Sequence, residues 1–409
     1  MTTTSQRPST AADADHGDHG DHGDLSGLRV LHVTDCFDGG VATAVNQYAE
    51  LAGDLEHLLL ANNARSTSPT AGRTPGAFAV DLDMPEDPRA AVAAIRAAVR
   101  THTPDVVHAH SSFAGAYARL AWMADRVTPG RREVPVVYTP HSFAFERADI
   151  PTWKRRAFRG VEQVLHPLTT VGAPCADWEG ELMLDLDPRG ILPRQVLGNG
   201  TRVPVVVVPN ALSDAHPATP DSWAPEASEP PVVGVVSRVT PQRDPEFFAQ
   251  TAELIRKARP DARFVWVGDG DGKDASLVDL LTDAGVEVTG WLSGDELRET
   301  VAGLSVLVHT ARWDGFPMAV LEARRIGVPL LVRDIPALRE CPATARFDTP
   351  QDAADKALAI LDTGADPTHW SALDRAHTPE AQRAKLQEVY RLALQRAGRR
   401  QRTTGGVAG

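Results

Sequence analysis

Residues 29–51, RVLHVTDCFDGGVATAVNQYAEL, contain the pattern that decides the fold class. The stretch begins with RVLHVT, a mainly apolar run with the length of a buried strand. Gly39 and Gly40 follow, and the residues up to about Leu51 have the pattern of a helix. A short buried strand, a glycine turn and a helix form the repeating unit of sheets whose strands run parallel.

The same alternation continues on either side of a Pro-, Ser- and Ala-rich segment, residues 213–231, which is typical of an interdomain linker. Before this segment, further strands are predicted at 57–60, 77–82, 105–108, 135–139, 168–171 and 203–208, with helices at 87–100 and 113–126. After it, strands are predicted at 232–237, 263–267, 286–289, 305–309 and 329–332, with helices between them.

We therefore predict an α/β protein with two Rossmann-like, doubly wound domains, residues 27–212 and 232–378, which face each other across a cleft. Ligands of such sheets bind beyond the carboxyl ends of the strands, so the cleft is the predicted site. A last helix over residues 379–397 is expected to pack back toward the N-terminal domain. Residues 1–26 and 398–409 are expected to be disordered tails.

Composition excludes several classes of protein. The chain has 409 residues with 42 Lys+Arg and 54 Asp+Glu, and its net charge of −12 argues against a nucleic-acid partner. Its 3 cysteines do not make a disulfide framework and fit a reducing compartment. Neither a bilayer-spanning apolar run nor a secretory leader is present, so we expect a cytoplasmic protein with at most peripheral membrane contact. The HGDHGDHGD repeat at 16–24 could hold a metal weakly, but we interpret it as a solvated tail and expect no metal.

Residues 310–327, TARWDGFPMAVLEARRIG, carry the most informative chemical pattern. Gly315, Phe316 and Pro317 open a helix after a strand, and the free N–H groups of a helix N-terminus suit a phosphate. Glu322 lies one turn into this helix among apolar residues, where a carboxylate needs a partner. Two partners remain open from the residues alone, a ribose diol or an ion pair with Arg325.

This segment resembles the nucleotide-sugar site of the retaining GT-B glycosyltransferases of family 4. The family has two glutamates in a context like EGFP…LEA, and this chain has Asp314 in WDGFP and Glu322 in LEA. The resemblance implies that Glu322 binds the nucleotide ribose and that Asp314 contacts hydroxyls of the donor sugar. Asp314 departs from the family by one methylene, which shortens the reach of the carboxylate toward the donor sugar.

Residues 235–245, VVSRVTPQRDP, resemble the family segment in which an Arg and a Lys clamp the donor diphosphate. Arg238 matches the first cation, and Arg243 stands where the family has Lys. Cations suit this role because negative charge builds on the departing diphosphate. Alternatively, Arg238 makes an ion pair at the domain surface. Gly268, in the turn VGDGDG, is similar to a family glycine beside the nucleotide base.

The N-terminal domain adds weaker similarities. Gly39 and Gly40 resemble a family loop near the donor phosphates and the acceptor. His141 matches a family histidine under the sugar-transfer centre, and we prefer it to His110 as a catalytic candidate. His108 lies within its strand and is interpreted as core, and the turn at residues 209–211 is interpreted as architectural.

One further segment, residues 153–159 (WKRRAFR), is a basic and partly aromatic helix candidate. It could face anionic lipid or a lipid-phosphate acceptor, or it could be a solvated helix face.

The resemblance implies transfer of a glycosyl group from a nucleoside-diphosphate sugar to an acceptor hydroxyl with retention, in cell-surface polysaccharide, glycolipid or glycoconjugate synthesis. It implies neither a metal nor another cofactor, with the nucleotide sugar as co-substrate and an acceptor that the sequence does not identify. Two alternatives stay open: a nucleotide-sugar 2-epimerase-like enzyme, which would need no acceptor, and a non-catalytic nucleotide-sugar-binding protein.

Overall fold

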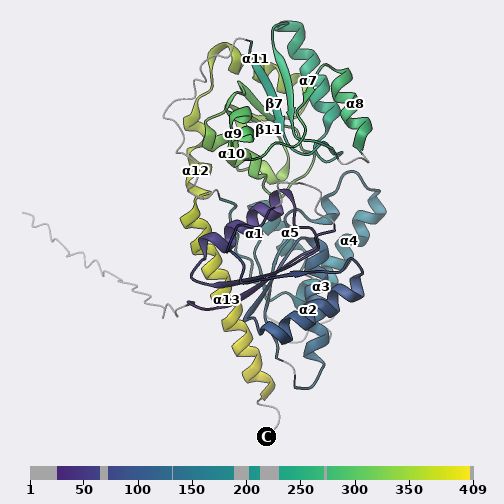
Figure 1. Cartoon of the computed structure of the whole chain (residues 1–409), viewed down its shortest axis with the longest axis vertical. Coiled ribbons are helices and arrows are strands. Elements are labelled where there is room, and N and C mark those ends of the chain that lie inside the picture. Colours follow the sequence, from purple (N-terminus) through teal and green to yellow (C-terminus); the bar gives the residue numbers. More distant parts are fainter. Residues whose placement is uncertain are drawn as a thin grey trace, which may run out of the picture.

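The computed structural model describes residues 25–64, 72–130, 132–187, 202–211, 230–270 and 274–405. Within these ranges the chain forms two six-stranded parallel sheets covered by helices, one above the other in Figure 1. We call them the N-terminal lobe (residues 25–211 and the last helix) and the C-terminal lobe (residues 230–376). The arrangement confirms the predicted α/β class with two doubly wound domains. Most of the predicted tail at 1–26 and linker at 213–231 falls outside the described residues.

The N-terminal sheet has the strand order β3-β2-β1-β4-β5-β6, in which every described pairing is parallel. Its strands are β1 Arg29–Thr34, β2 Glu56–Ala61, β3 Val80–Asp83, β4 Val106–His110, β5 Val136–Thr139 and β6 Val171–Gly172. The helices of this part of the chain are α1 Gly39–Leu51, α2 Pro88–His102, α3 Ser112–Arg126, α4 Thr152–Leu165 and α5 Asp177–Asp185.

The C-terminal sheet, β12-β11-β10-β7-β8-β9, repeats the same topology, with its first strand β7 beside its fourth, β10. Its strands are β7 Val232–Val236, β8 Arg263–Val267, β9 Glu287–Val288, β10 Val306–His309, β11 Leu330–Arg333 and β12 Arg346–Phe347. The helices are α7 Pro245–Ala258, α8 Ala275–Asp283, α9 Gly294–Ala302, α10 Met318–Ile326, α11 Pro350–Thr363, α12 Ser371–Ala376 and α13 Pro379–Gly405.

Local chemistry sets where helices begin. Before α2, the Asp87 carboxylate accepts hydrogen bonds from the backbone N–H groups of Arg89 and Ala90, at 3.0 and 2.9 Å. Pro88 then occupies the first turn, where its missing N–H costs nothing. The helix ends at Thr103, which has a left-handed backbone (φ 46°).

Two sequence predictions were wrong in detail. Residues 203–208 do not form a regular strand, because Pro174 and Pro204 each lack an N–H and the pairing with β6 reduces to a bridge between Gly172 and Val205. The last helix, α13, continues to Gly405, beyond the predicted end at 397.

Helix α13 packs against the N-terminal lobe although it follows the C-terminal lobe in sequence (Figure 1). Leu386, Val389, Tyr390 and Ala393 are fully buried in one apolar cluster with residues of β1, β4 and β5. The N-terminal lobe is therefore completed by the end of the chain. Among the described helices, none combines the length and the apolar character that crossing a bilayer requires.

Candidate active site

A cavity of about 410 Å³ lies between the lobes, at the carboxyl ends of strands from both sheets. Its size is in the range of small-molecule sites. The structure places every residue that the sequence analysis assigned to the site in its lining: Gly39, Gly40, His141, Arg238, Arg243, Gly268, Asp314, Gly315, Phe316, Pro317 and Glu322. Residues from both lobes therefore meet in one cavity.

Glu322 presents a carboxylate to the cavity from the first turns of α10. Within the described part of the chain it forms no ion pair with Arg325, so that alternative is not observed. Burial raises the pKa of Glu322, because no cation among the described residues offsets the loss of water around this carboxyl group. A ligand with two adjacent hydroxyls would give this carboxylate the donors that it lacks.

Asp314 is held in the loop between β10 and α10. It accepts a hydrogen bond from the Gly315 N–H at 2.9 Å and forms an ion pair with Arg243. Burial raises the pKa of Asp314, but the charge of Arg243 and a contact from His309 at 3.6 Å outweigh burial and hold it well below its usual range. Asp314 is therefore ionised, and it fixes Arg243 at the cavity wall.

Cations and helix N-termini face each other across the cavity. Arg238 follows β7, and its side chain is 40% exposed and 3.9 Å from the Asp38 carboxylate of the other lobe. Gly39 and Gly40 open α1, and Asp38 caps that helix at the Gly39 N–H. Arg238 is thus weakly held and available to an anionic ligand in the cavity, which the starts of α1 and α10 also line.

Glycines let backbone segments approach closely here. Gly268 has φ +138°, and a Cβ at this position would lie 2.2 Å from the Ser237 carbonyl oxygen. At Gly315 a Cβ would lie 3.0 Å from the Ser142 N of the other lobe and 3.1 Å from a Glu179 carboxylate oxygen. Gly268 therefore has no room for a side chain, and a side chain at Gly315 would be crowded by atoms of the N-terminal lobe.

Pro317 occupies the N-cap of α10, one position earlier than the sequence analysis placed it, and its backbone is extended. Asn210 donates a hydrogen bond to the Phe316 carbonyl at 2.8 Å and so ties the turn at 209–211 to this loop. That turn joins the lobes.

His141 is on the N-terminal wall of the cavity, in a strained turn where it and Ser142 have positive φ values of 49° and 78°. The buried Glu179 carboxylate holds this turn by accepting from the N–H groups of Ser142 and Cys175. Burial lowers the pKa of His141 to about 4, so the ring is neutral at pH 7. His110 lies beneath it, bonded to His141 at 3.1 Å and outside the cavity lining.

Among the residues that sequence reasoning missed are Asp38, Trp291 and His309, which line the cavity, and Glu179, which holds the turn of His141. Trp291 follows β9 in the run VTGWL, where an aromatic residue at a strand end could have been noticed. Glu179 carries a weaker signal, because α5 (DWEGELMLD) contains other carboxylates from which the sequence does not distinguish it. Asp38 lies between the strand and the helix of its βα unit and His309 ends the strand of another, and the sequence analysis had already singled out both units for neighbouring residues.

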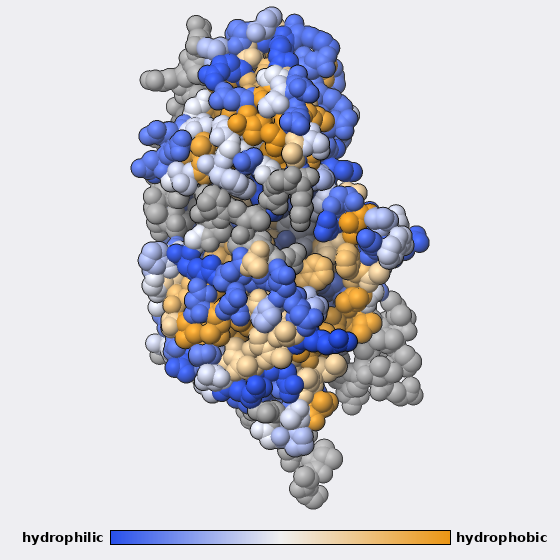
Figure 2. Space-filling view, turned by 45° about the vertical axis from the view of Figure 1, so that its right-hand side comes forward, coloured by the Kyte–Doolittle hydropathy of each residue, from blue (hydrophilic) through white to orange (hydrophobic). Residues whose placement is uncertain are grey.

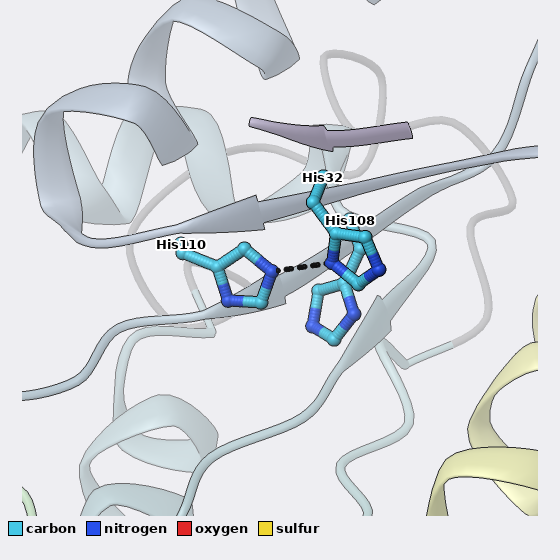
Figure 3. A group of neighbouring side chains, drawn as sticks. All are labelled: His32, His108 and His110. Atoms are coloured by element: carbon cyan, nitrogen blue, oxygen red, sulfur yellow. Dashed lines mark hydrogen bonds between the residues drawn. The ribbon is translucent and has the colours of Figure 1, made fainter. Parts of the chain in front are cut away.

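One group of histidines has the composition of a metal site. His32, His108 and His110 are fully buried, and one nitrogen from each lies within 4.8 Å of the others (Figure 3). His108 is in the core, as expected, with hydrogen bonds to Thr139 Oγ1 at 2.8 Å and to the Tyr390 hydroxyl at 3.0 Å. The nitrogens of all three rings are engaged by protein neighbours.

The basic segment at 153–159 forms the start of α4, and most of its side chains are exposed. Trp153 and Val164 are each 66% exposed on this helix, and Met123 of the neighbouring α3 is 43% exposed. Figure 2 shows hydrophobic and hydrophilic residues mixed over the N-terminal lobe, on the face that carries α4.

Comparisons with known proteins cover both lobes. A family model described as Glycosyl transferases group 1 matches residues 230–363, and one described as Glycosyltransferase Family 4 matches residues 38–183. The UDP-Gal:alpha-D-GlcNAc-diphosphoundecaprenol alpha-1,3-galactosyltransferase of Escherichia coli is 28% identical over 60% of this chain and 61% of its own length. A GDP-mannose-dependent alpha-mannosyltransferase of Mycobacterium tuberculosis is 27% identical over 58% of this chain and 57% of its own. Each match thus spans less than two thirds of the relative.

Solved structures share the architecture. HepE from Anabaena in complex with UDP superposes with a TM-score of 0.60, covering 93% of this chain and 100% of that one at 14% identity. At this identity the likeness concerns the fold.

Proposed function

The chain belongs to the GT-B group 1 glycosyltransferases, and from this premise we propose that it moves a sugar from a nucleoside-diphosphate sugar to an acceptor hydroxyl with retention at the anomeric carbon. The product would be a polysaccharide, a glycolipid or another glycoconjugate. The observation that carries the proposal is the cavity itself, which is lined by the Glu322 carboxylate, by the guanidinium groups of Arg238 and Arg243, and by the start of α10.

Each part of the donor has a matching group in the cavity. Glu322 accepts hydrogen bonds from the ribose hydroxyls. Arg238 and Arg243 neutralise the diphosphate, whose charge grows as the glycosidic bond breaks. Asp314 and His141, which face the cavity from opposite lobes, contact the sugar between them. In this proposal no metal ion is needed, since the guanidinium groups and helix N-termini supply the positive charge.

Retention follows in this proposal from attack on the face from which the diphosphate leaves. The departing phosphate oxygen takes the proton of the acceptor hydroxyl, so no carboxylate has to act as a covalent nucleophile. Closure of the lobes would exclude water and so suppress hydrolysis of the donor.

The acceptor is proposed to be a saccharide carried on a lipid, with the protein at the inner face of a membrane. The named relative from Escherichia coli acts on a diphosphoundecaprenol-linked sugar. On this chain the exposed Trp153 lies among the basic residues at the start of α4, a combination that suits an anionic lipid surface, and Val164 is exposed near the end of the same helix.

The test is calorimetric titration of the full chain with UDP and with GDP, without added metal and again with EDTA. One of the two should bind, and Glu322→Ala should weaken it about 10- to 100-fold, because charge-assisted hydrogen bonds are worth about 1.5–3 kcal/mol each. Arg325→Ala, on the same helix, is the matched control and should bind as the wild type does. Equal binding by Glu322→Ala would contradict the assignment.

Activity assays separate the alternatives. Turnover of a nucleotide sugar without any acceptor would favour the epimerase-like reading, and tight binding without transfer to any acceptor would favour a binding protein. With a working donor and acceptor, the NMR coupling of the new anomeric proton reports retention or inversion directly.

A further inference from the structure

A row of four imidazoles crosses the N-terminal sheet and ends at the cavity. It starts at the Ala52 carbonyl, which lies 2.9 Å from His57 Nε2. His57 Nδ1 is 2.9 Å from His32 Nε2, and His32 Nδ1 is 3.0 Å from His110 Nε2 (dashed in Figure 3). His110 Nδ1 is 3.1 Å from Nε2 of His141, which lines the cavity.

The first contact in this row determines which nitrogen of each imidazole ring carries the proton. A carbonyl oxygen only accepts, so His57 carries its proton on Nε2 and its Nδ1 must accept. His32 then donates from Nε2 and accepts at Nδ1, and the same reasoning passes the pattern to His110. At the end of the row, His141 donates from Nε2 to His110.

The rings are neutral, which this reasoning requires. Burial lowers the pKa of His32, His57, His110 and His141, and neighbouring imidazoles lower the pKa of His32 and His110 further. Each ring therefore holds one proton at pH 7, and a single proton can serve only one of its two nitrogens.

A metal ion is the competing explanation for these histidines. Zinc holds imidazole nitrogens at about 2.0–2.1 Å in a tetrahedron, which requires those nitrogens to be about 3.3 Å apart. The nitrogens of His32, His108 and His110 lie within 4.8 Å of one another, and two of them, His32 Nδ1 and His110 Nε2, are already hydrogen-bonded to each other at 3.0 Å. His108 is also occupied on both sides: Thr139 Oγ1 donates to the Ala173 carbonyl at 2.6 Å and so accepts from His108 Nε2, while the Tyr390 hydroxyl donates to Nδ1. The hydrogen-bonded row accounts for the observed contacts without breaking any.

We propose that the Ala52 carbonyl, acting through His57, His32 and His110, holds His141 in the tautomer with its proton on Nε2, so that Nδ1 meets the substrate as a hydrogen-bond acceptor. Among the described residues none binds His141 Nδ1, which leaves that nitrogen for a ligand. His32, His57 and His110 are positioning residues, since they act on the ligand through His141.

This inference rests on the proposed function for the nature of the ligand. A lone pair at Nδ1 accepts from an O–H or N–H group and repels an anionic oxygen. The group that meets His141 is therefore a sugar hydroxyl or amide N–H, and neither a carboxylate nor a phosphate oxygen.

Histidine-labelled NMR tests the proposal without any substrate. In the full chain carrying 15N-histidine, the His141 signals, identified by their loss in His141→Gln, should show a protonated Nε2 and an unprotonated Nδ1. His57→Asn should keep this state, because its amide oxygen takes the place of Nδ1 and accepts from His32. His57→Leu removes the acceptor, and a population of His141 protonated on Nδ1 should appear.

Several results would overturn the proposal. They are a wild-type His141 protonated on Nδ1, a His141 tautomer that His57→Leu leaves unchanged, or a His110 Nε2 that is unprotonated, as a metal ligand would be. If His57→Leu does not fold, His110→Asn and His110→Leu provide the same comparison one step nearer the cavity. The readout does not involve nucleotide binding, so failure here and failure of the proposed function are distinguishable.

Discussion

The two sheets share one strand order but have different interiors. The central strands β1 and β4 of the N-terminal sheet bury His32, His108 and His110 completely, whereas β7 and β10 of the C-terminal sheet are built of Val, Leu and Gly with a single histidine at the end of β10. The topology therefore determines where the cavity forms, and the interior determines what each lobe contributes to it.

That difference extends to the cavity walls. The C-terminal lobe contributes four charged groups, Arg238, Arg243, Asp314 and Glu322, whereas the charged residue that lines the cavity from the N-terminal lobe is Asp38. The N-terminal lobe thus holds polar groups inside, where each needs a partner, and the C-terminal lobe holds its charges at the cavity edge. Four predictions test this comparison.

The largest effect is expected in the N-terminal interior, at the ion pair between Arg119 and Glu162, whose side chains are 1% and 5% exposed. Arg119→Met leaves a buried carboxylate without its cation and should lower the free energy of unfolding by about 3–5 kcal/mol. Arg324→Met in the C-terminal lobe should cost only about 1 kcal/mol, because its partner Asp374 is 41% exposed and water can solvate it. Urea denaturation measures both, and equal losses would show that the two interiors do not differ in this way.

The next largest effect is expected at Arg243, on the side of the cavity that the C-terminal lobe forms. Arg243→Ala removes a cation from the proposed diphosphate site and leaves Asp314 unpaired, so kcat should fall by about 10²- to 10³-fold. Arg243→Lys keeps the charge and should retain most of the activity. Steady-state kinetics with the donor identified by calorimetry measure this effect. If kcat falls only a few-fold in Arg243→Ala, the diphosphate binds elsewhere in the cavity.

A smaller effect, on stability, is expected when His141 on the N-terminal side of the cavity is exposed to acidic pH. The pKa of His141 is lowered from 6.5 to about 4, so between pH 7 and pH 5 the unfolded chain takes up a proton that the folded chain does not. By linkage, this single residue should lower the free energy of unfolding by about 2 kcal/mol at pH 5. The stability difference between wild type and His141→Gln should therefore shift by this amount in favour of the variant.

The difference between variants is the quantity to measure in that experiment. Burial raises the pKa of Glu146 in the same lobe to about 7, and this carboxyl group changes stability in the opposite direction. Urea unfolding of both proteins at pH 7, 6 and 5 isolates the histidine. A constant difference across this range would mean that His141 titrates normally in the folded state.

The smallest effect is expected at the surface. Lys154→Glu on α4 should weaken binding to vesicles that contain phosphatidylglycerol, since each basic residue near an anionic membrane contributes about 1 kcal/mol. Lys257→Glu, on α7 of the C-terminal lobe, is the matched control and should change vesicle binding little. Co-sedimentation measures both, with neutral phosphatidylcholine vesicles as reference, and equal loss in the two variants would exclude α4 as the contact.

Much of the fold and of the cavity lining could be predicted because the evidence is local. Strands with continuous apolar runs, such as Val232–Val236, can be recognised from the sequence alone. Residues just after such strands must lie at one edge of a parallel sheet. That reasoning placed Gly39, His141 and Asp314 in one cavity although they are far apart in sequence.

The histidine row could not be predicted, because it depends on register. His32 pairs with Leu59 on one side and with His108 on the other, and a shift of one residue would turn its ring to the opposite face. Nothing in the local sequence determines that register. Glu179 was missed for a related reason, since its partner Ser142 lies 37 positions away.

The path of the chain between the lobes has a consequence for dividing the protein. It passes once after Ala211 and again between α12 and α13, and the two passages are joined where the His377 ring donates to the Asn210 carbonyl at 2.7 Å. Because α13 completes the N-terminal lobe, a fragment ending at residue 211 would expose the surface that Leu386 and Tyr390 cover. A chain cut between 212 and 229 would instead leave α13 on the C-terminal piece, and the two pieces should associate through this helix when they are produced together.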